Sequence, residues 1–255
     1  DILQQDSDTS DLDTDQDTLE EILQSYQEAI KLHPEDADSY YGLGNVYRHQ
    51  GNLTKAAQAY QEAVKFNPNH TDSYNNLGVT LKEQGRFKEA IRAYNEAIKI
   101  DPSDVDVHNN LGNAYRSQNQ LEEAEKAYLR VIELDPDYAY AYNNLGITYL
   151  SQNQLEAARK ACLKAVELAP DYANAYYNLG LVYADQEKLE EAIQAYEKAV
   201  ELNPEDANAS ESLKMGYFNQ GNKSYQQGKL EEARTAYQKV IQLNSEDANL
   251  HYNLG

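Results

Sequence analysis

A short motif recurs in this 255-residue chain every 34 residues, and this period limits the possible folds more than any other feature. In most copies the motif reads Tyr-x-x-Leu-Gly-x-x-Tyr, and a second motif of the form Ala-x-x-x-Tyr-x-x-Ala, followed by a proline, comes after it. Val131 replaces the last alanine in the third copy, and Cys162 replaces the tyrosine in the fourth. The Leu-Gly pairs are Leu43-Gly44, Leu77-Gly78, Leu111-Gly112, Leu145-Gly146 and Leu179-Gly180. A fixed period of this size is typical of arrays in which each repeat packs on its neighbours.

Both motifs have the spacing of a helix. Tyr40, Leu43 and Tyr47 are three and four residues apart, so they share one helix face. Two amphipathic helices of this length cannot bury their apolar faces alone, so they must pack on each other and on the next pair. Gly44 and Ala56 are small, which predicts that the two helices of a pair approach closely, with tyrosines filling the space beside them.

The links between the helices contain residues that suit turns. Glycine or asparagine follows the first helix in most repeats, as at Gly51 and Asn153, and both tolerate the left-handed conformation of a helix end. Glu187 is the exception, for which we expect mild strain or a different turn. Each proline ends the second helix, because proline lacks an N–H group and restricts the preceding residue.

A period of 34 with these two motifs resembles the tetratricopeptide repeat, and the resemblance covers nearly the whole chain after about residue 19. It implies an all-α fold: a right-handed superhelical α-solenoid of antiparallel helix pairs. Residues 19–34 match the second helix of a partial first repeat. The expected full repeats cover residues 37–70, 71–104, 105–138, 139–172 and 173–206.

The chain before the array is acidic. Residues 1–18 carry seven aspartates and no lysine or arginine, so we expect a flexible leader that buries little apolar surface. The run from Asp11 to Asp15 is similar to the start of a calcium-binding loop. Gln16 and Ile22 occupy the places where that loop needs glycine and glutamate, so a solvated tail is the favoured interpretation.

The last repeat, residues 207–247, is irregular because it contains seven extra residues. Seven residues are about two helical turns, so the insertion keeps the helix face in phase. We expect one long first helix from about Ala207 to Gln226, with a bend at Gly216 or Gly221 as the alternative. Residues 248–255 match the start of a truncated repeat, and we expect both ends of the sequence to be cut from a longer protein.

Composition narrows the function classes. The formal net charge of −21 argues against nucleic acid, whose phosphates require clustered lysine and arginine, and favours a neutral or basic polypeptide partner. We expect no membrane insertion, because no apolar run is long enough. The one cysteine excludes an internal disulfide and suits a reducing compartment, so the expected location is cytoplasmic.

No catalytic motif is present. The chain lacks a phosphate-binding glycine loop and a nucleophile elbow, and its histidines are not at ligand spacing, so we expect no enzyme activity, no cofactor and no metal site. His108 stands in place of a first-helix tyrosine and Cys162 in place of a second-helix tyrosine, so we expect both to be packing residues.

The resemblance implies a binding surface, because the first helices of tetratricopeptide arrays line a concave groove that binds peptides. Asparagine recurs immediately before the Leu-Gly leucine in this chain, although it is a mediocre helix former. These side chains bond to the neighbouring repeat, or simply descend from duplication of the repeat, or hold the backbone of a bound peptide. A similar asparagine ladder lines the repeats of O-linked N-acetylglucosamine transferases. The candidate groove residues are Tyr41, Asn45, Arg48, Asn75, Asn76, Lys82, Asn109, Asn110, Asn113, Arg116, Asn143, Asn144, Tyr177 and Asn178.

Arg48, Lys82 and Arg116 occupy one position of successive first helices, where later repeats have Leu150 and Ala184. They form either ordinary solvated charge or a basic stripe that pairs with a carboxylate of the partner. The carboxylate clamp of chaperone-binding tetratricopeptide domains is not predicted, because Phe218 stands where that clamp requires a lysine.

The leading prediction is a non-enzymatic scaffold that binds a peptide or protein segment in the groove, for example during complex assembly. One alternative is the substrate-recognition arm of a larger enzyme, such as a glycosyltransferase with its catalytic domain beyond Gly255. Another is self-association through the exposed repeat ends. The asparagine- and glutamine-rich repeats favour a bacterial source.

Overall fold

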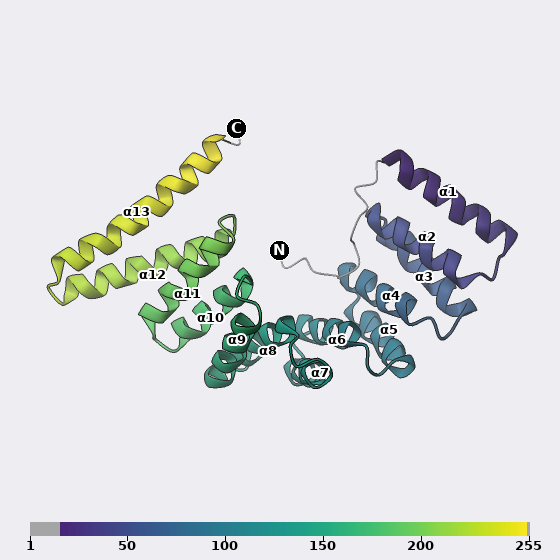
Figure 1. Ribbon diagram of the computed structural model, residues 1–255, viewed down its shortest axis with the longest axis horizontal. Helices are drawn as coiled ribbons and strands as arrows, with labels where there is room; N and C mark the ends of the chain where they lie inside the picture. The colour runs from purple at the N-terminus through teal and green to yellow at the C-terminus, as the bar shows by residue number, and fades with distance from the viewer. Residues whose placement is uncertain (1–15, 254–255) are drawn as a thin grey trace. The chain divides into compact units, whose positions relative to one another are not determined.

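The computed structural model describes residues 16–253, and the side chains of residues 18–243. Within this range every regular element is a helix (Figure 1). The helices are α1 (Gln16–Leu32), α2 (Ala37–His49), α3 (Leu53–Phe66), α4 (Thr71–Glu83), α5 (Phe87–Ile100), α6 (Val105–Ser117), α7 (Leu121–Leu134), α8 (Ala139–Ser151), α9 (Leu155–Leu168), α10 (Ala173–Asp185), α11 (Leu189–Leu202), α12 (Ala207–Gln226) and α13 (Leu230–Asn253).

The helices group into two compact units, which we call the N-terminal unit (Asp1–Gln118) and the C-terminal unit (Asn119–Gly255). Inside the N-terminal unit, α2 pairs with α3 and α4 with α5, and α3 packs on α4. Inside the C-terminal unit, α8 pairs with α9, α10 with α11, and α12 with α13. The prediction of an all-α solenoid built from consecutive helix pairs is confirmed.

A glycine on the first helix of a pair lies directly against a tyrosine of the second helix. A Cβ atom added to Gly44 would stand 2.5 Å from Cε1 of Tyr60, which is too close for any side chain. Tyr60 is fully buried. The same contact recurs in other pairs of both units: Gly78 with Tyr94, Gly180 with Tyr196, and Gly221 with Tyr237. The repeated glycine is therefore required for close approach of the helices.

The turn after each first helix uses one left-handed residue. Gly51, Gly85 and Gly228 have φ values of 72°, 73° and 75°. Asn119 and Asn153 have φ values of 57° and 60°, and Glu187 has 59°. Of the two outcomes expected at Glu187, the structure has the strained one: the turn is the same, with a glutamate in a conformation that suits glycine or asparagine.

Helix α1 begins at Gln16, three residues before the expected start at Leu19. It packs on α2 as a second helix would, because Gly42 lies against the ring of Tyr26, where an added Cβ would be 2.2 Å from Cζ. The rest of the acidic leader, including Asp11–Asp15 with its similarity to a calcium loop, lies outside the described residues.

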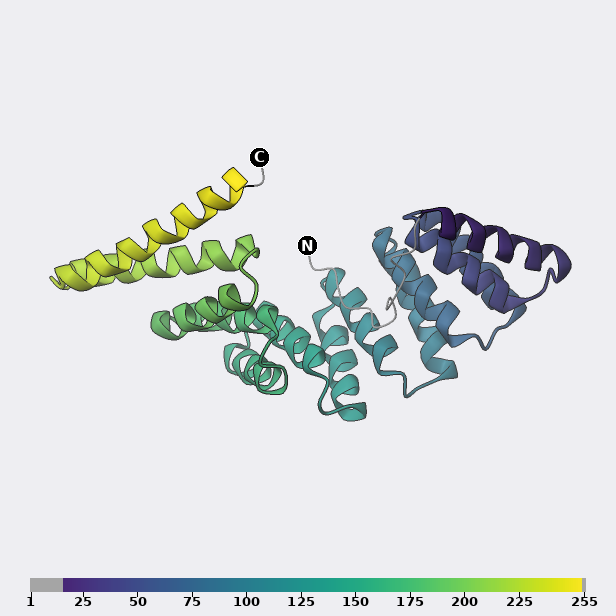
Figure 2. The same cartoon turned by 45° about the horizontal axis from the view of Figure 1, so that its top comes forward.

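Helix α12 runs from Ala207 to Gln226 without a break, and Figure 2 shows it beside α13 as the longest helix pair. Its two internal glycines serve packing: an added Cβ on Gly216 would be 2.9 Å from Cγ1 of Ile193, and one on Gly221 would be 2.5 Å from Cε1 of Tyr237. Tyr217 is buried between these contacts. The structure therefore has the long helix and not the bend.

The end of the chain differs from expectation. Helix α13 continues to Asn253, so residues 248–253 do not begin a separate helix, and residues 254–255 lie outside the described range. Proline ends the second helix in the earlier repeats, whereas Ser245 stands at that place here. Serine keeps its N–H group and leaves the preceding residue unrestricted, so the helix propagates.

Candidate functional site

The predicted groove residues lie on the first helices of the repeats. Helices α2, α4 and α6 carry those of the N-terminal unit, and α8 and α10 carry those of the C-terminal unit. We call these two surfaces the first-helix faces, one for each unit. Three of the predicted residues are buried, namely Asn110, Asn143 and Asn178, and the others are half-buried.

Asparagine side chains connect adjacent repeats in the N-terminal unit. The Nδ2 group of Asn76 donates to the hydroxyl of Tyr41 at 3.3 Å and to Oδ1 of Asn45 at 3.1 Å. The Nδ2 group of Asn110 donates to Oδ1 of Asn75 at 3.2 Å. The residue before the Leu-Gly leucine therefore reaches the residue 35 positions earlier, in the preceding repeat.

The C-terminal unit has the same link. Nδ2 of Asn178 donates to Oδ1 of Asn143 at 2.8 Å, and Nδ2 of Asn143 donates to the hydroxyl of Tyr172 at 3.2 Å. Asn143 is 3% exposed and Asn178 is 8% exposed. Buried amides need partners, so this bond stabilises the contact between the repeats. Asn76, Asn110 and Asn178 thus show the neighbour-bonding alternative that the sequence left open.

The amides also keep bonding capacity that these links do not use. Asn75 accepts from Asn110, and its own Nδ2 group makes no hydrogen bond within the described residues. Oδ1 of Asn110 likewise accepts none within the described residues. One donor and one acceptor therefore stand on neighbouring repeats, which is the pairing that one peptide unit requires.

The basic stripe is partly paired inside the protein. Nη2 of Arg48 lies 3.3 Å from Oε1 of Glu83 on the next first helix, and both side chains are about three-quarters buried. Burial raises the pKa of Tyr60, and the nearby Arg48 guanidinium opposes that rise. The Nε atom of Arg116 is shielded from solvent and has no acceptor among the described residues.

His108 and His70 make hydrogen bonds near the N-terminal ends of helices. Nε2 of His108 lies 3.1 Å from the Pro102 carbonyl oxygen, and the hydroxyl of Tyr40 donates to the Pro34 carbonyl in the same way at 3.3 Å. Nδ1 of His70 accepts from the backbone N–H of Ser73 at 3.2 Å and so caps α4. Within the described residues no three His, Cys, Asp or Glu side chains gather as a metal site would require.

Cys162 is fully buried beneath Gly146, and burial raises the pKa of its thiol to about 12. A protonated, inaccessible thiol is not a nucleophile at neutral pH. The packing role expected from its replacement of a tyrosine therefore agrees with its position.

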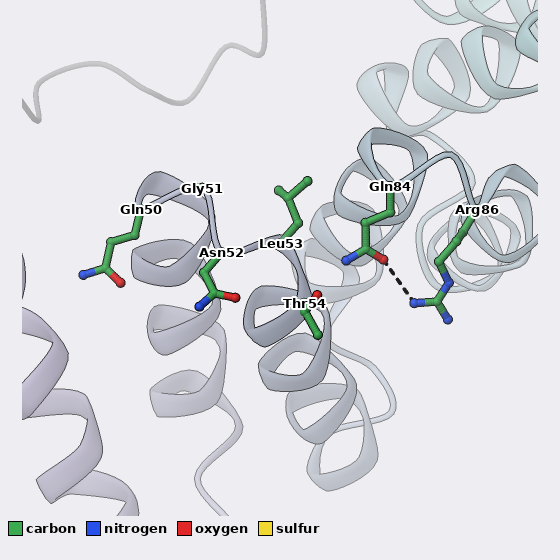
Figure 3. A pocket seen from close by; sticks show the side chains of 7 residues that line it. All are labelled: Gln50, Gly51, Asn52, Leu53, Thr54, Gln84 and Arg86. Atoms are coloured by element: carbon green, nitrogen blue, oxygen red, sulfur yellow. Dashed lines mark hydrogen bonds between the residues drawn. The ribbon is translucent and has the colours of Figure 1, made fainter.

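A shallow pocket lies outside the predicted site, at the turns after α2 and α4 (Figure 3). Nη1 of Arg86 donates to Oε1 of Gln84 at 3.1 Å, and the same guanidinium contacts Glu89 at 2.8 and 2.7 Å. The guanidinium of Arg86 is therefore already used by the turn and the start of α5. The lining residues are Gln50, Gly51, Asn52, Leu53, Thr54, Gln84 and Arg86.

Sequence reasoning missed an exposed apolar surface on α12. The side chains of Met215, Phe218 and Tyr225 are 54%, 47% and 64% exposed. Their spacing of three and seven residues places them on one helix face. A signal was available, because Phe218 occupies the position that Tyr41 has in the first full repeat.

Among the described helices, none combines the length and the apolar content needed to cross a bilayer. A search of the curated proteins found no match to this chain. Solved structures do match. A structure of MamA is 28% identical with a TM-score of 0.60, covering 68% of this chain and 95% of that chain.

Two further structures share the fold. The crystal structure of YrrB, described as a TPR protein with an unusual peptide-binding site, is 24% identical with a TM-score of 0.60, covering 73% of this chain and 96% of that one. The C-terminal part of a TPR repeat-containing protein from Cytophaga hutchinsonii is 17% identical with a TM-score of 0.75, covering 89% and 91%.

Three family models match the sequence. The model described as "Cilia and flagella-associated protein 70 C-terminal domain" matches residues 71–241, which is more than half of the chain. Models described as "TPR repeat" and "Tetratricopeptide repeat" match residues 44–85 and 25–58. Together with the helix-pair fold, these matches show that the chain belongs to the tetratricopeptide repeat family, in the branch that the first of these models describes.

Proposed function

We propose that this protein is a non-enzymatic scaffold that binds a peptide or protein segment on its first-helix faces. The observation that carries the proposal is the asparagine link between repeats. This link holds the side-chain amide of Asn110 against that of Asn75. It leaves the Nδ2 donor of Asn75 and the Oδ1 acceptor of Asn110 available to a partner. Held side chains lose less conformational entropy on binding than mobile ones, so they suit recognition.

This arrangement favours recognition of backbone over recognition of particular side chains. A peptide unit offers one N–H donor and one C=O acceptor, which the Oδ1 of Asn110 and the Nδ2 of Asn75 complement. The half-buried Tyr41 and Tyr177, one on each unit's face, add apolar area with few rotatable bonds. A scaffold of this kind accepts partners that differ in sequence.

The family supports the general part of the proposal. Tetratricopeptide repeats stack to form extended surfaces on which partners bind. YrrB, which shares the fold, is described as having an unusual peptide-binding site. The net charge of −21 favours a neutral or basic partner over an acidic one.

A selection from a library of random displayed peptides on the purified chain tests the proposal. Peptides that are enriched are then titrated against Asn75→Asp, which keeps the oxygen that accepts from Asn110 but removes the Nδ2 donor. We expect about tenfold weaker binding, which corresponds to the loss of one hydrogen bond of about 1.4 kcal/mol.

The matched control is Gln58→Glu, which makes the same charge change on the exposed surface of α3, a second helix. Binding to this control is expected to equal wild type, and both variants must melt as wild type does. An equal loss of affinity in both variants would show that the added negative charge, and not the missing Nδ2 donor, weakens binding. Failure of the library to enrich any peptide would reject the proposal.

A further inference from the structure

Two first helices of the C-terminal unit, α8 and α10, are almost free of charge. Helix α8 contains no Asp, Glu, Lys or Arg, and α10 contains only Asp185, in its last turn. In the chain as a whole, 25% of the residues are charged. The second helices α7 and α11 of the same unit exceed that average, with charged residues at six and five of their 14 positions.

Apolar residues stand at the positions where earlier repeats have polar ones. Ile147 and Leu181 occupy the position of Asn45 and Asn113. Leu150 likewise replaces the arginine of the basic stripe. These three apolar side chains are half-buried, so each keeps part of its surface in contact with solvent.

Helix α12 extends this apolar surface. Tyr177 and Leu181 on α10 pack against a core cluster whose members come from α11 and α12, so α11 links the two first helices. Phe218 stands at the α12 position that corresponds to Tyr177, and Met215 lies one turn earlier on the same face. About half of each of these last two side chains is exposed.

We propose that the first-helix face of the C-terminal unit, together with the exposed apolar residues of α12, binds a polypeptide segment with apolar anchor side chains and basic flanks. The anchors contact Ile147, Leu150, Tyr177, Leu181, Met215 and Phe218. This inference rests on the proposed scaffold function and specifies the chemistry of the segment that one of the two faces takes. Contiguous exposed apolar area on a protein surface is typical of such sites.

Charge decides the chemistry of the segment. A charged side chain of the partner that faces α8 would lose its hydration and find no opposite charge on that helix. The anchors are therefore uncharged and apolar. The unit that carries the face is acidic, with exposed carboxylates such as Glu191 and Glu197 on α11. The lysines of α12, Lys214 and Lys223, are paired with Glu211 and Glu190, so basic residues suit the flanks.

The same charge argues against a lipid surface as the occupant. Biological membranes present anionic headgroups, and these repel an acidic protein with a net charge of −21. A polypeptide segment can match the apolar face and the acidic surroundings together, since its side chains vary along its length. The segment is thus favoured over the bilayer on electrostatic grounds.

The test uses the displayed peptide library on the whole chain and reads the composition of the enriched peptides. We expect apolar anchors flanked by lysine or arginine. The double variant Ile147→Asn with Leu181→Asn introduces residues that the chain itself has at this position in other repeats, which favours retention of the fold. Affinity for the enriched peptides that carry apolar anchors and basic flanks should fall at least about tenfold, as expected when two apolar contacts are lost.

Leu129→Ser is the control, because Leu129 is an exposed leucine on α7, a second helix, and it should leave affinity unchanged. Enriched peptides that are polar or acidic, or that bind the double variant as tightly as wild type, would overturn the inference. If such peptides still lose affinity for Asn75→Asp, the proposed scaffold function stands without it. If no peptide is enriched, both the proposed scaffold function and this inference are rejected.

Vesicles provide the remaining arm of the test. Co-sedimentation of the chain with phosphatidylcholine vesicles, or with vesicles that contain phosphatidylserine, is expected to be absent for wild type and for the double variant. If the wild-type chain sediments with vesicles and the double variant does not, the apolar face binds a lipid surface and the inference is overturned. Circular dichroism melting of each variant checks that loss of binding is not loss of fold.

Discussion

Individual polar side chains form hydrogen bonds between adjacent repeats, and several of these bonds share one residue. In the N-terminal unit, Oδ1 of Asn45 accepts from the hydroxyl of Tyr60 at 2.7 Å and from Nδ2 of Asn76 at 3.1 Å. The three residues come from α2, α3 and α4, so one amide oxygen ties a helix pair to the next repeat. A partly buried group of this kind is stabilising only while each member keeps its partner.

Asn178→Ala tests this role in the C-terminal unit. The variant removes the donor at 2.8 Å and leaves the buried Oδ1 of Asn143 without it, so we expect the free energy of unfolding to fall by about 1–3 kcal/mol. Urea denaturation followed by circular dichroism measures the change. Asn174→Ala, on the exposed surface of the same helix, should change it by less than about 0.5 kcal/mol. Equal effects would show that the link is not stabilising.

Glu187 offers a gain in stability. Its φ of 59° costs a glutamate more than it costs an asparagine, the residue found at this turn as Asn119 and Asn153. Glu187→Asn should raise the free energy of unfolding by about 0.5–1 kcal/mol, measured by urea denaturation. Glu187→Ala keeps a Cβ without the local bonding of asparagine and should bring no such gain. A destabilised asparagine variant would contradict the assignment of strain.

The thiol of Cys162 predicts a pH dependence. Burial raises its pKa from the ordinary value of 9.0 to about 12, so folding favours the protonated form. Its contribution to stability is complete below pH 9 and is lost as pH rises toward 12. Between pH 8 and pH 10 the free energy of unfolding of wild type should fall by about 1 kcal/mol more than that of Cys162→Ala.

Comparing the two proteins cancels the titration of the tyrosines, which both contain. A thiol reagent adds a second measurement, since the native chain should react very slowly at pH 8 and the urea-unfolded chain rapidly. Fast labelling of the folded chain would contradict the burial of the thiol.

At the scale of elements, the helices differ in how their first turns are capped. Asp36, Asn52, Asp104 and Asp206 accept hydrogen bonds from backbone N–H groups at the starts of α2, α3, α6 and α12. The starts of α5, α7, α8, α9, α10 and α11 have no side-chain cap. These helices therefore depend more on tertiary packing than on their own ends.

Gln154→Asn should supply a missing cap. The backbone at Gln154 has φ −92° and ψ 66°, close to the −84° and 68° of Asn52, whose side chain accepts from the N–H of Lys55. We expect an added bond to the N–H of Ala157 and a gain of about 0.5–1 kcal/mol in the free energy of unfolding. Asn52→Gln should lose a similar amount. If Asn52→Gln lowers the free energy of unfolding but Gln154→Asn does not raise it, α9 is already fully stabilised by packing.

For the molecule as a whole, charge is the dominant long-range effect. Most ion pairs between described residues join positions three apart on one exposed helix surface, such as Lys65 with Glu62 and Lys99 with Glu96. Pairs of this kind contribute little to stability. They offset little of the self-repulsion of a chain with a net charge of −21.

Salt should therefore stabilise the protein. Raising sodium chloride from low concentration to 0.3 M shortens the screening length, and we expect the melting temperature to rise by about 2–4 °C, which is roughly 1 kcal/mol for a chain of this size. Differential scanning calorimetry measures it, with potassium chloride as a check against a specific ion effect. An unchanged or lower melting temperature would show that the ion pairs outweigh the repulsion.

The sequence by itself determined the local architecture. A 34-residue period with helical spacing inside it specifies two helices per repeat, and the glycine of the Leu-Gly pair specifies a close contact with the second helix, in most repeats with a tyrosine, as in Gly44 and Tyr60. The long α12 followed from the phase of a seven-residue insertion. These features were predictable because they depend on residues close in sequence and repeat five times over.

Only the tertiary structure decided which groups meet between repeats. Asparagine at a fixed helix position is compatible with a bound peptide or a neighbouring amide, and the 2.8 Å bond from Asn178 to Asn143 exists because packing brings residues 35 positions apart into contact. Packing likewise left Met215 and Phe218 exposed, although they are as apolar as the core. A hydrogen-bond partner or an exposed fraction depends on distances between separate elements, which a one-dimensional pattern does not contain.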